Sequence, residues 1–208
     1  MIKAVLFDFD GVIIDSEKST IEFFQETFRH FNLPIPQKKD FEPLAGLKTI
    51  DMVRRLLPHL PEEKITPIFE DSLIMSVKYV SRIELFPKAR ETLEILKKNY
   101  KLGVITNRSK LTIEALFELH KLREYFQITL TRDDITKHKP HPQGLKTAMK
   151  KLGVLANEAI YVGDTKIDVD AAHNAKIPCV LISPAKNDFG ADYQMQKIEE
   201  LPKLIAHI

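Results

Sequence analysis

The feature that most limits the fold is an apolar run near the amino terminus that stops at two carboxylates. Residues 2–7 are almost all apolar, and Asp8-Phe9-Asp10-Gly11 follows directly. Such a run is typical of a strand buried on both faces, as in a parallel sheet. Alternate side chains of a strand point the same way, so we expect Asp8 and Asp10 to face together at its carboxyl end. Open parallel sheets bind their ligands at that end.

Two carboxylates held at one strand end repel each other. At a separation of roughly 4 Å and an effective dielectric near 20, the repulsion is about 4 kcal/mol. A fold tolerates it where a cation or a reaction uses the two charges, whereas a strand that merely ends at a solvated turn is the alternative for this motif alone. Gly11 permits a sharp turn, and we expect its N–H to approach an anionic group.

Beyond the first strand, the chain divides into a helical part and a part in which helices alternate with strands. Between residues 16 and 80 apolar side chains recur at helical spacing, interrupted by prolines, without a strand pattern. From residue 86 onward short apolar strands alternate with helices, which predicts right-handed crossovers and a parallel sheet. The expected strands are residues 102–106, 126–130, 159–163 and 178–182.

These patterns predict an α/β fold. We expect a doubly wound, Rossmann-like parallel sheet formed by residues 1–15 and 81–208. A helical cap of residues 16–80 is inserted after the first strand, directly above the strand-end carboxylates. That is the position of a lid.

Composition and charge exclude several functional classes. The 208 residues include 31 basic and 29 acidic side chains, a net charge of +2, so we expect neither nucleic acid nor a membrane as a partner. The single cysteine, Cys179, excludes an intramolecular disulfide and suits a reducing compartment. The first residues have the pattern of a strand rather than of a signal peptide. We therefore expect a cytoplasmic protein that is a monomer or a weak dimer.

The other predicted strands also end in groups that suit phosphate chemistry. Thr106-Asn107 offers a hydroxyl, an amide and backbone N–H groups to phosphate oxygens. Lys139 lies in a proline-bounded loop, where a cation would offset clustered carboxylates. Considered singly, Thr106 as an ordinary strand residue and Lys139 as a solvated lysine are the alternatives. His138 and His141 lack a third ligand nearby, so we do not expect them to bind a metal ion.

A further pair of carboxylates follows the strand at residues 159–163. Asp164 ends this strand, and Asp168 lies one helical turn later, where capping a helix is the alternative role. With Asp8 and Asp10 they would form an oxygen-rich cluster, which favours a hard cation such as Mg²⁺. A carboxylate beside bound Mg²⁺ can attack phosphorus and form an aspartyl phosphate.

The order and separation of these motifs resemble those of the haloacid dehalogenase superfamily of phosphotransferases. The four motifs of that superfamily have counterparts here in Asp8-Phe9-Asp10-Gly11, Thr106-Asn107, Lys139-Pro140, and Gly163-Asp164 with Asp168. The similarity covers essentially the whole chain. Each motif alone is a weak signal, and the four together are a strong one.

The resemblance implies catalytic roles for four residues. Asp8 would be the nucleophile that becomes phosphorylated. Asp10 would protonate the leaving oxygen and then activate water. Thr106 and Lys139 would hold the phosphoryl oxygens.

It also implies how substrate and metal are bound. Backbone N–H groups near Gly11 and Asn107 would assist with the phosphoryl oxygens. Mg²⁺ would be bound by Asp8, by the carbonyl of Asp10 and by Asp164, with Asp168 in support.

Asp10 and the cap narrow the expected reaction. Relatives that act as dehalogenases, phosphonatases or ion pumps have another residue in place of Asp10, so its presence implies phosphate-ester chemistry. The insertion is similar to the larger cap of the phosphoglycolate phosphatase, pyrophosphatase and β-phosphoglucomutase branch. Thr106-Asn107 resembles the phosphoglycolate phosphatases, whereas residues 11–16 lean toward the mutases.

We therefore predict a Mg²⁺-dependent phosphatase for a small phosphorylated metabolite, either phosphoglycolate-like or a sugar phosphate. A hexose-phosphate mutase is the alternative, and a non-catalytic binding protein is disfavoured by the intact set of acids. Substrate choice should come from the cap, where the loop of residues 44–48 is placed to dip into the site. Lys48 is a candidate for a second anionic group of the substrate, with a solvated lysine as the alternative.

Overall fold

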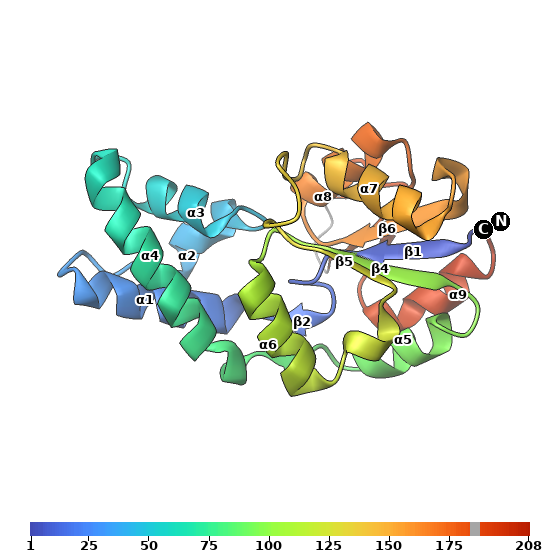
Figure 1. The fold of residues 1–208 in the computed structure, drawn as a ribbon, viewed down its shortest axis with the longest axis horizontal. Coiled ribbons are helices and arrows are strands. Elements are labelled where there is room, and N and C mark those ends of the chain that lie inside the picture. Colours follow the sequence, from blue (N-terminus) through green and yellow to red (C-terminus); the bar gives the residue numbers. More distant parts are fainter. Residues whose placement is uncertain (184–187) are drawn as a thin grey trace.

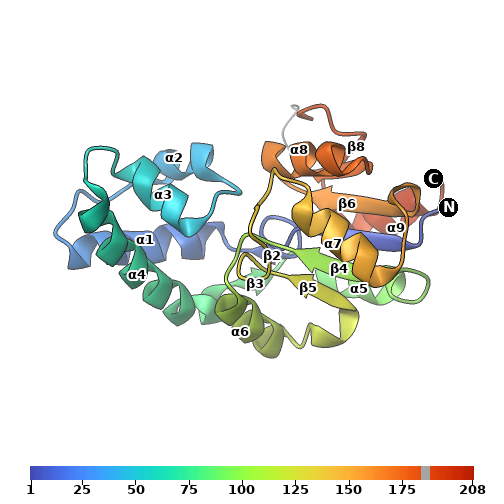
Figure 2. The ribbon, with the colours of Figure 1, turned by 45° about the horizontal axis from the view of Figure 1, so that its top comes forward.

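The computed structural model describes residues 1–183 and 188–208. Figure 1 shows an elongated molecule, with the sheet and its helices at one end and the helical cap at the other. The two termini lie side by side at the end that is remote from the cap (Figures 1 and 2).

A six-stranded sheet with the order β5-β4-β1-β6-β7-β8 forms the centre of the core. Its strands are β1 (Ala4–Phe7), β4 (Lys101–Ile105), β5 (Ile128–Leu130), β6 (Ala159–Gly163), β7 (Cys179–Ile182) and β8 (Tyr193–Met195). All the pairings are parallel, and β1 lies between β4 and β6. The chain therefore leaves β1 in the middle of the carboxyl edge. The predicted doubly wound α/β fold is confirmed.

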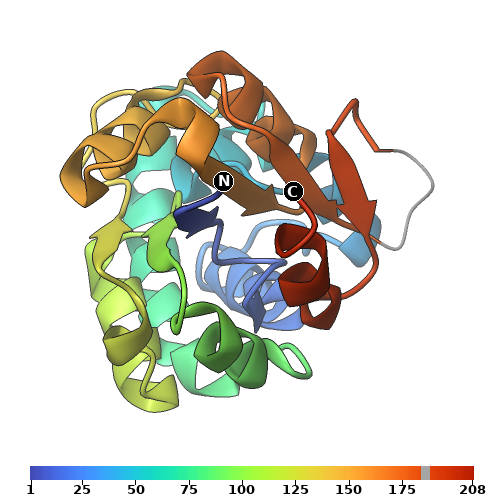
Figure 3. The same cartoon turned by 90° about the vertical axis from the view of Figure 1, so that its right-hand side faces the viewer.

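Helices cover both faces of the sheet because the side chains of each strand alternate between two apolar cores (Figure 3). Val5 and Phe7 face a core shared with α5 (Ala89–Leu96), α6 (Lys110–His120) and α9 (Leu201–Ile205). Ala4 and Leu6 face a core shared with α7 (Gln143–Leu152) and α8 (Lys166–Ala175). Cys179, the single cysteine, is buried in this second core.

The cap has an apolar core of its own, built around Phe24 and Val53. Its helices are α1 (Glu17–His30), α2 (Lys38–Phe41), α3 (Thr49–Leu56) and α4 (Glu62–Lys78), with a 3-10 turn at Glu42–Leu44. The chain enters and leaves the cap side by side, because β2 (Ile14–Asp15) pairs antiparallel with β3 (Glu84–Leu85). The domain boundaries proposed from the sequence stay a prediction.

The structure adds elements that the sequence pattern did not indicate. The edge strand β8 has only three residues, of which only Met195 is buried, so it lacks the apolar run that marks a central strand. The strands β2 and β3 have two residues each, too few to show any periodicity. In the described ranges there is no helix with the length and apolar character needed to span a membrane.

Candidate active site

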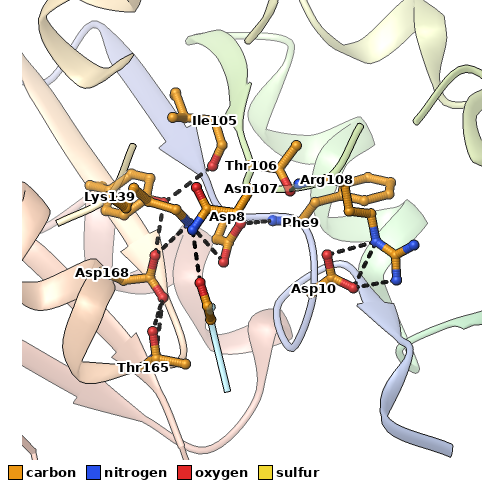
Figure 4. Close-up of polar contacts among 12 residues, drawn as sticks. Asp8, Phe9, Asp10, Ile105, Thr106, Asn107, Arg108, Lys139, Thr165 and Asp168 are labelled. Atoms are coloured by element: carbon orange, nitrogen blue, oxygen red, sulfur yellow. Dashed lines mark hydrogen bonds and ion pairs between the residues drawn. The ribbon is translucent and has the colours of Figure 1, made fainter. Parts of the chain in front are cut away.

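Asp8 follows β1 and lies at the centre of a buried group of charges (Figure 4). Its Oδ2 atom is 2.9 Å from Nζ of Lys139, and its Oδ1 atom accepts a 2.7 Å hydrogen bond from the N–H of Phe9. Burial, with the charge of Asp168 adding to it, outweighs the opposing ammonium group of Lys139 and raises the pKa of Asp8 to about 7. Each oxygen of the Asp8 carboxylate is thus held by a partner, and one of these partners is a cation.

Lys139 comes from the loop before α7 and is held between two carboxylates. Its Nζ lies 2.7 Å from Oδ1 of Asp168 and 2.9 Å from Asp8, and it donates a 3.0 Å hydrogen bond to the hydroxyl of Tyr161. Burial acts to lower the pKa of Lys139, but Asp168 and Asp8 outweigh burial and raise it above its usual value. Lys139 is therefore a permanent cation that offsets part of the carboxylate cluster.

Asp168 is fully buried at the third position of α8, and both of its oxygens have protein partners. Oδ1 accepts a 3.0 Å hydrogen bond from the Tyr161 hydroxyl as well as contacting Lys139. Oδ2 accepts hydrogen bonds from the N–H and the hydroxyl of Thr165, at 3.2 and 2.6 Å. Burial opposes ionisation of Asp168, but Lys139 outweighs it and lowers the pKa. Asp168 therefore closes the first turn of α8 and also holds Lys139.

Asp164 follows β6 and packs against the turn at Gly11. Gly11 has φ +70°, and a Cβ atom there would lie 1.8 Å from Oδ2 of Asp164, so only glycine fits. The N–H of Gly11 donates to the carbonyl of Ile14 at 3.1 Å. This corrects the expectation that it approaches an anionic group, because the N–H is already used in the turn. Gly11 instead provides the space that Asp164 occupies.

The carboxylates of Asp8, Asp164 and Asp168 each bring one oxygen into a group whose members lie within 4.8 Å of one another. Burial raises the pKa of Asp164 well above its usual value, with the Asp168 and Asp8 charges adding to it. Within residues 1–183 and 188–208 no hydrogen bond or ion pair reaches the Asp164 carboxylate. Convergent carboxylates of this kind are the donors that a hard divalent cation prefers.

The side chain of Asp10 lies outside this group, where Arg108 binds it (Figure 4). Nε of Arg108 lies 2.9 and 2.8 Å from the two oxygens of Asp10, and Nη2 lies 2.7 Å from Oδ1. Ser16 donates a further hydrogen bond to Oδ1. Burial opposes ionisation of Asp10, but the charge of Arg108 outweighs it and lowers the pKa. Asp10 and Asp8 therefore line one cleft but have different cationic partners.

Thr106 and Asn107 follow β4 at the same edge of the sheet. Thr106 is buried, and its hydroxyl accepts a 3.1 Å hydrogen bond from the N–H of Arg108. Nδ2 of Asn107 donates a 2.8 Å hydrogen bond to the carbonyl of Gly46, in the cap loop of residues 44–48. That loop therefore reaches the site, as expected. Lys48 is not among the residues that line the cleft. Its Nζ lies 3.5 Å from an oxygen of Asp51, and its side chain is partly solvated.

A cleft of about 530 Å³ separates the cap from the carboxyl edge of the sheet. Its floor contains Asp8, Asp10 and Asp164, together with the arginines Arg108 and Arg132. The cap contributes two carboxylates, Glu17 and Glu42, and a larger set of apolar side chains, which are Ile21, Phe23, Phe41, Leu44, Ala45, Leu47, Met52 and Leu73. The cleft therefore has the size for a small molecule whose charged groups face the core.

The geometry can be compared with known proteins. The family model of the haloacid dehalogenase-like hydrolases matches residues 5–182. The chain belongs to this family. Among its haloacid dehalogenase-like relatives is the pyrophosphatase PpaX of Bacillus cereus (strain AH820), which is 31% identical over 183 residues, 88% of this chain and 83% of that protein. The family and this relative make the chain a hydrolase of the phosphatase type, as predicted.

Two solved structures show how widely the fold is shared. A predicted phosphoglycolate phosphatase from Haemophilus somnus 129pt has a TM-score of 0.91 at 21% identity, with 98% of each chain covered. The β-phosphoglucomutase of Clostridium difficile has a TM-score of 0.86 at 21% identity, covering 100% of this chain and 96% of that one. The predicted resemblance to this branch of haloacid dehalogenase-like proteins is confirmed at the level of the fold.

Sequence reasoning missed three polar residues of the site. Arg108 directly follows Thr106-Asn107, and its position next to this motif is the sequence feature that could have indicated a role in the site. Tyr161 lies inside the apolar run of β6, where a tyrosine is an ordinary strand residue. Thr165 follows Asp164 at the start of α8, and its hydroxyl is the capping signal three residues before Asp168.

Proposed function

We propose that the protein is a Mg²⁺-dependent phosphatase that hydrolyses a small phosphorylated metabolite through an aspartyl phosphate on Asp8. The observation that carries this proposal is that Asp8 and Asp164 converge on the floor of one cleft, with Lys139 buried 2.9 Å from Asp8. A carboxylate nucleophile needs a neighbouring positive charge and a route to its substrate, and Asp8 has both.

The residues present fit a magnesium ion. Asp164 has no hydrogen-bond or ion-pair partner in the described part of the chain. Burial raises its pKa and that of Asp8, and the charge of Asp168 adds to the shift of both. Asp8, Asp164 and the carbonyl of Asp10 would hold the ion, with Asp168 acting through Lys139. When bound, Mg²⁺ neutralises charge on the carboxylates and on the transferring phosphoryl group.

The protein's own groups divide the reaction into two steps. In the first, an oxygen of Asp8 attacks phosphorus, the bond from phosphorus to the substrate oxygen breaks, and Asp10 gives that oxygen a proton. In the second, water attacks the same phosphorus while Asp10 takes its proton, and the bond to Asp8 breaks to release phosphate. Lys139 and Thr106 hold the phosphoryl oxygens in both steps.

The size and lining of the cleft support a small metabolite, and we retain phosphoglycolate-like molecules and sugar phosphates as candidates. Pyrophosphate joins them because the curated relatives are named pyrophosphatases. We also propose that the enzyme acts in the cytoplasm without a nucleic-acid or membrane partner, as its near-neutral charge and single buried cysteine suggest.

A mutase is the second candidate, favoured by the structural similarity to a β-phosphoglucomutase. The same active site would then return the phosphoryl group to a second hydroxyl of the sugar instead of to water. A mutase would release little free phosphate and would need a bisphosphate to start its cycle.

The proposal is tested by measuring phosphate release from phosphoglycolate, pyrophosphate and hexose phosphates, with Mg²⁺ and with a chelator. We expect Mg²⁺-dependent release from at least one class and a loss of about 1,000-fold or more in Asp8→Asn. Asp170→Asn makes the same change on the exposed side of α8 and should leave activity intact. Wild-type activity in Asp8→Asn would contradict the covalent mechanism.

A further inference from the structure

Arg108 and Asp10 form the most complete polar pair that lines the cleft. Nε and Nη2 of Arg108 contact both oxygens of Asp10, in the fork geometry that arginine forms with carboxylates. Among the described residues no hydrogen bond or ion pair reaches Nη1 of Arg108, and the side chain is 13% exposed. The guanidinium group therefore borders the cleft with donor capacity left over.

This pair conflicts with the work that the proposed mechanism assigns to Asp10. Both oxygens of Asp10 are occupied by Arg108, yet one of them must give a proton to the leaving oxygen of the substrate. Opening the pair without replacement would leave a desolvated guanidinium group, which is costly. Another anion must therefore take the place of Asp10 on Arg108 when substrate binds.

The position of Arg108 indicates where that anion comes from. The phosphoryl group would lie between Asp8, Lys139 and Thr106, and Arg108 follows Thr106 by two residues in the lining of the same cleft. Arg132 lines the same cleft, and its backbone N–H donates a 3.0 Å hydrogen bond to the carbonyl of Arg108. The guanidinium group of Arg132 lies against the cap residue Phe69. The cleft thus has cations beyond those that the phosphoryl group would use.

We propose that Arg108 is a specificity-determining residue that binds a second anionic group of the substrate and releases Asp10 in exchange. This inference rests on the proposed phosphatase function and names its substrate class, small phosphate compounds that carry a carboxylate or a second phosphoryl group a few bonds from the reacting one. One anion replaces another on the same guanidinium group, so Arg108 keeps an anionic partner, and the released Asp10 can take up from solvent the proton that it gives to the leaving oxygen. Compounds without the second anion leave the Arg108–Asp10 pair closed and react slowly.

The kinetic test compares phosphoglycolate with 2-hydroxyethyl phosphate, which has a hydroxymethyl group in place of the carboxylate. In the wild-type enzyme with Mg²⁺ we expect kcat/KM for phosphoglycolate to be higher by about 30-fold or more. Arg108→Gln should bring the ratio close to one, and Arg108→Lys should give an intermediate value because it retains charge without the fork. Arg123→Gln removes an exposed arginine on another surface and should leave the ratio unchanged.

A binding experiment tests the recognition of the second anionic group without turnover. Calorimetry with Mg²⁺ compares 3-phosphonopropionate with 3-hydroxypropylphosphonate, the phosphonate counterparts of the two substrates. We expect the carboxylate compound to bind about 30-fold more tightly to the wild type and equally to Arg108→Gln. Equal binding of both compounds by the wild type, or a preference that persists in a folded Arg108→Gln variant, would overturn the inference. Selective binding without phosphate release from phosphoglycolate, pyrophosphate or hexose phosphates would overturn the phosphatase proposal and leave the role of Arg108 standing.

Discussion

Lys139 and Asp168 form a buried ion pair, with 2.7 Å between Nζ and Oδ1 and side chains that are 3% and 0% exposed. The pair connects the loop before α7 with the first turn of α8, and it points Lys139 at Asp8. A buried charge that loses its partner is costly because the remaining charge stays out of water. The geometry of the nucleophile therefore depends on a residue that begins a helix.

We expect Asp168→Asn to destabilise the protein by about 3 kcal/mol, because Lys139 would keep only Asp8 as an anionic partner. Urea unfolding at pH 7 measures the change. Asp170→Asn, at an exposed position of the same helix, serves as the matched control and should change stability by less than about 0.5 kcal/mol. Equal stabilities of the two variants would contradict the role given to the buried pair.

Gly11→Ala should abolish phosphatase activity in a protein that still folds. The added Cβ atom would lie 1.8 Å from Oδ2 of Asp164, so this carboxylate must move away from Asp8. Gly153→Ala is the control, since its φ is +65° and no atom lies within 4 Å of the added Cβ. Both variants carry the same backbone strain, of about 1 kcal/mol. Equal loss of activity in the two would show that strain, and not displacement of Asp164, is the cause.

Magnesium affinity should rise with pH. In the metal-free protein burial raises the pKa of Asp8 from 3.8 to about 7, so below pH 7 the folded site holds a proton that the metal must displace. In the metal-free protein this group also makes stability fall as pH rises from about 4 to about 7, because the unfolded chain has already lost the proton. Calorimetric titration between pH 5.5 and 8 should show apparent affinity rising by up to about tenfold per pH unit below 7. An affinity that does not change over this range would contradict the raised pKa.

The hydrogen bond from Asn107 to the carbonyl of Gly46 predicts a measurable effect on the cap. It spans 2.8 Å and ties the carboxyl edge of the sheet to the cap loop of residues 44–48. We expect Asn107→Leu to increase amide hydrogen exchange in that loop while exchange in β1 stays slow. Unchanged exchange in residues 44–48 would mean that other contacts hold the loop.

Much of the fold could be predicted because it depends on local patterns. The apolar run that ends at Asp8 and the alternation of strands and helices after residue 86 determine a parallel sheet and the edge at which its ligands bind. The strand at Tyr193–Met195 escaped prediction because its place in the sheet depends on pairing with β7 and not on its own side chains.

The identities of the site residues could be predicted from the sequence better than the contacts that these residues make. Asp8, Asp164 and Lys139 follow strands or precede a helix, so their meeting at one edge follows from topology. The pairing of Asp10 with Arg108 joins residues 98 positions apart, and only the three-dimensional structure shows it. The same holds for Gly11, whose N–H is used by a turn that the sequence does not specify.

In the proposed mechanism Asp8 receives the phosphoryl group of the substrate. Rapid acid quench of the wild-type enzyme during turnover of a ³²P-labelled substrate, followed by peptide mapping, tests this directly. We expect a hydroxylamine-sensitive label on the peptide that contains Asp8, formed and lost at rates compatible with turnover. Release of labelled phosphate from an active enzyme that never carries label on Asp8 would contradict it.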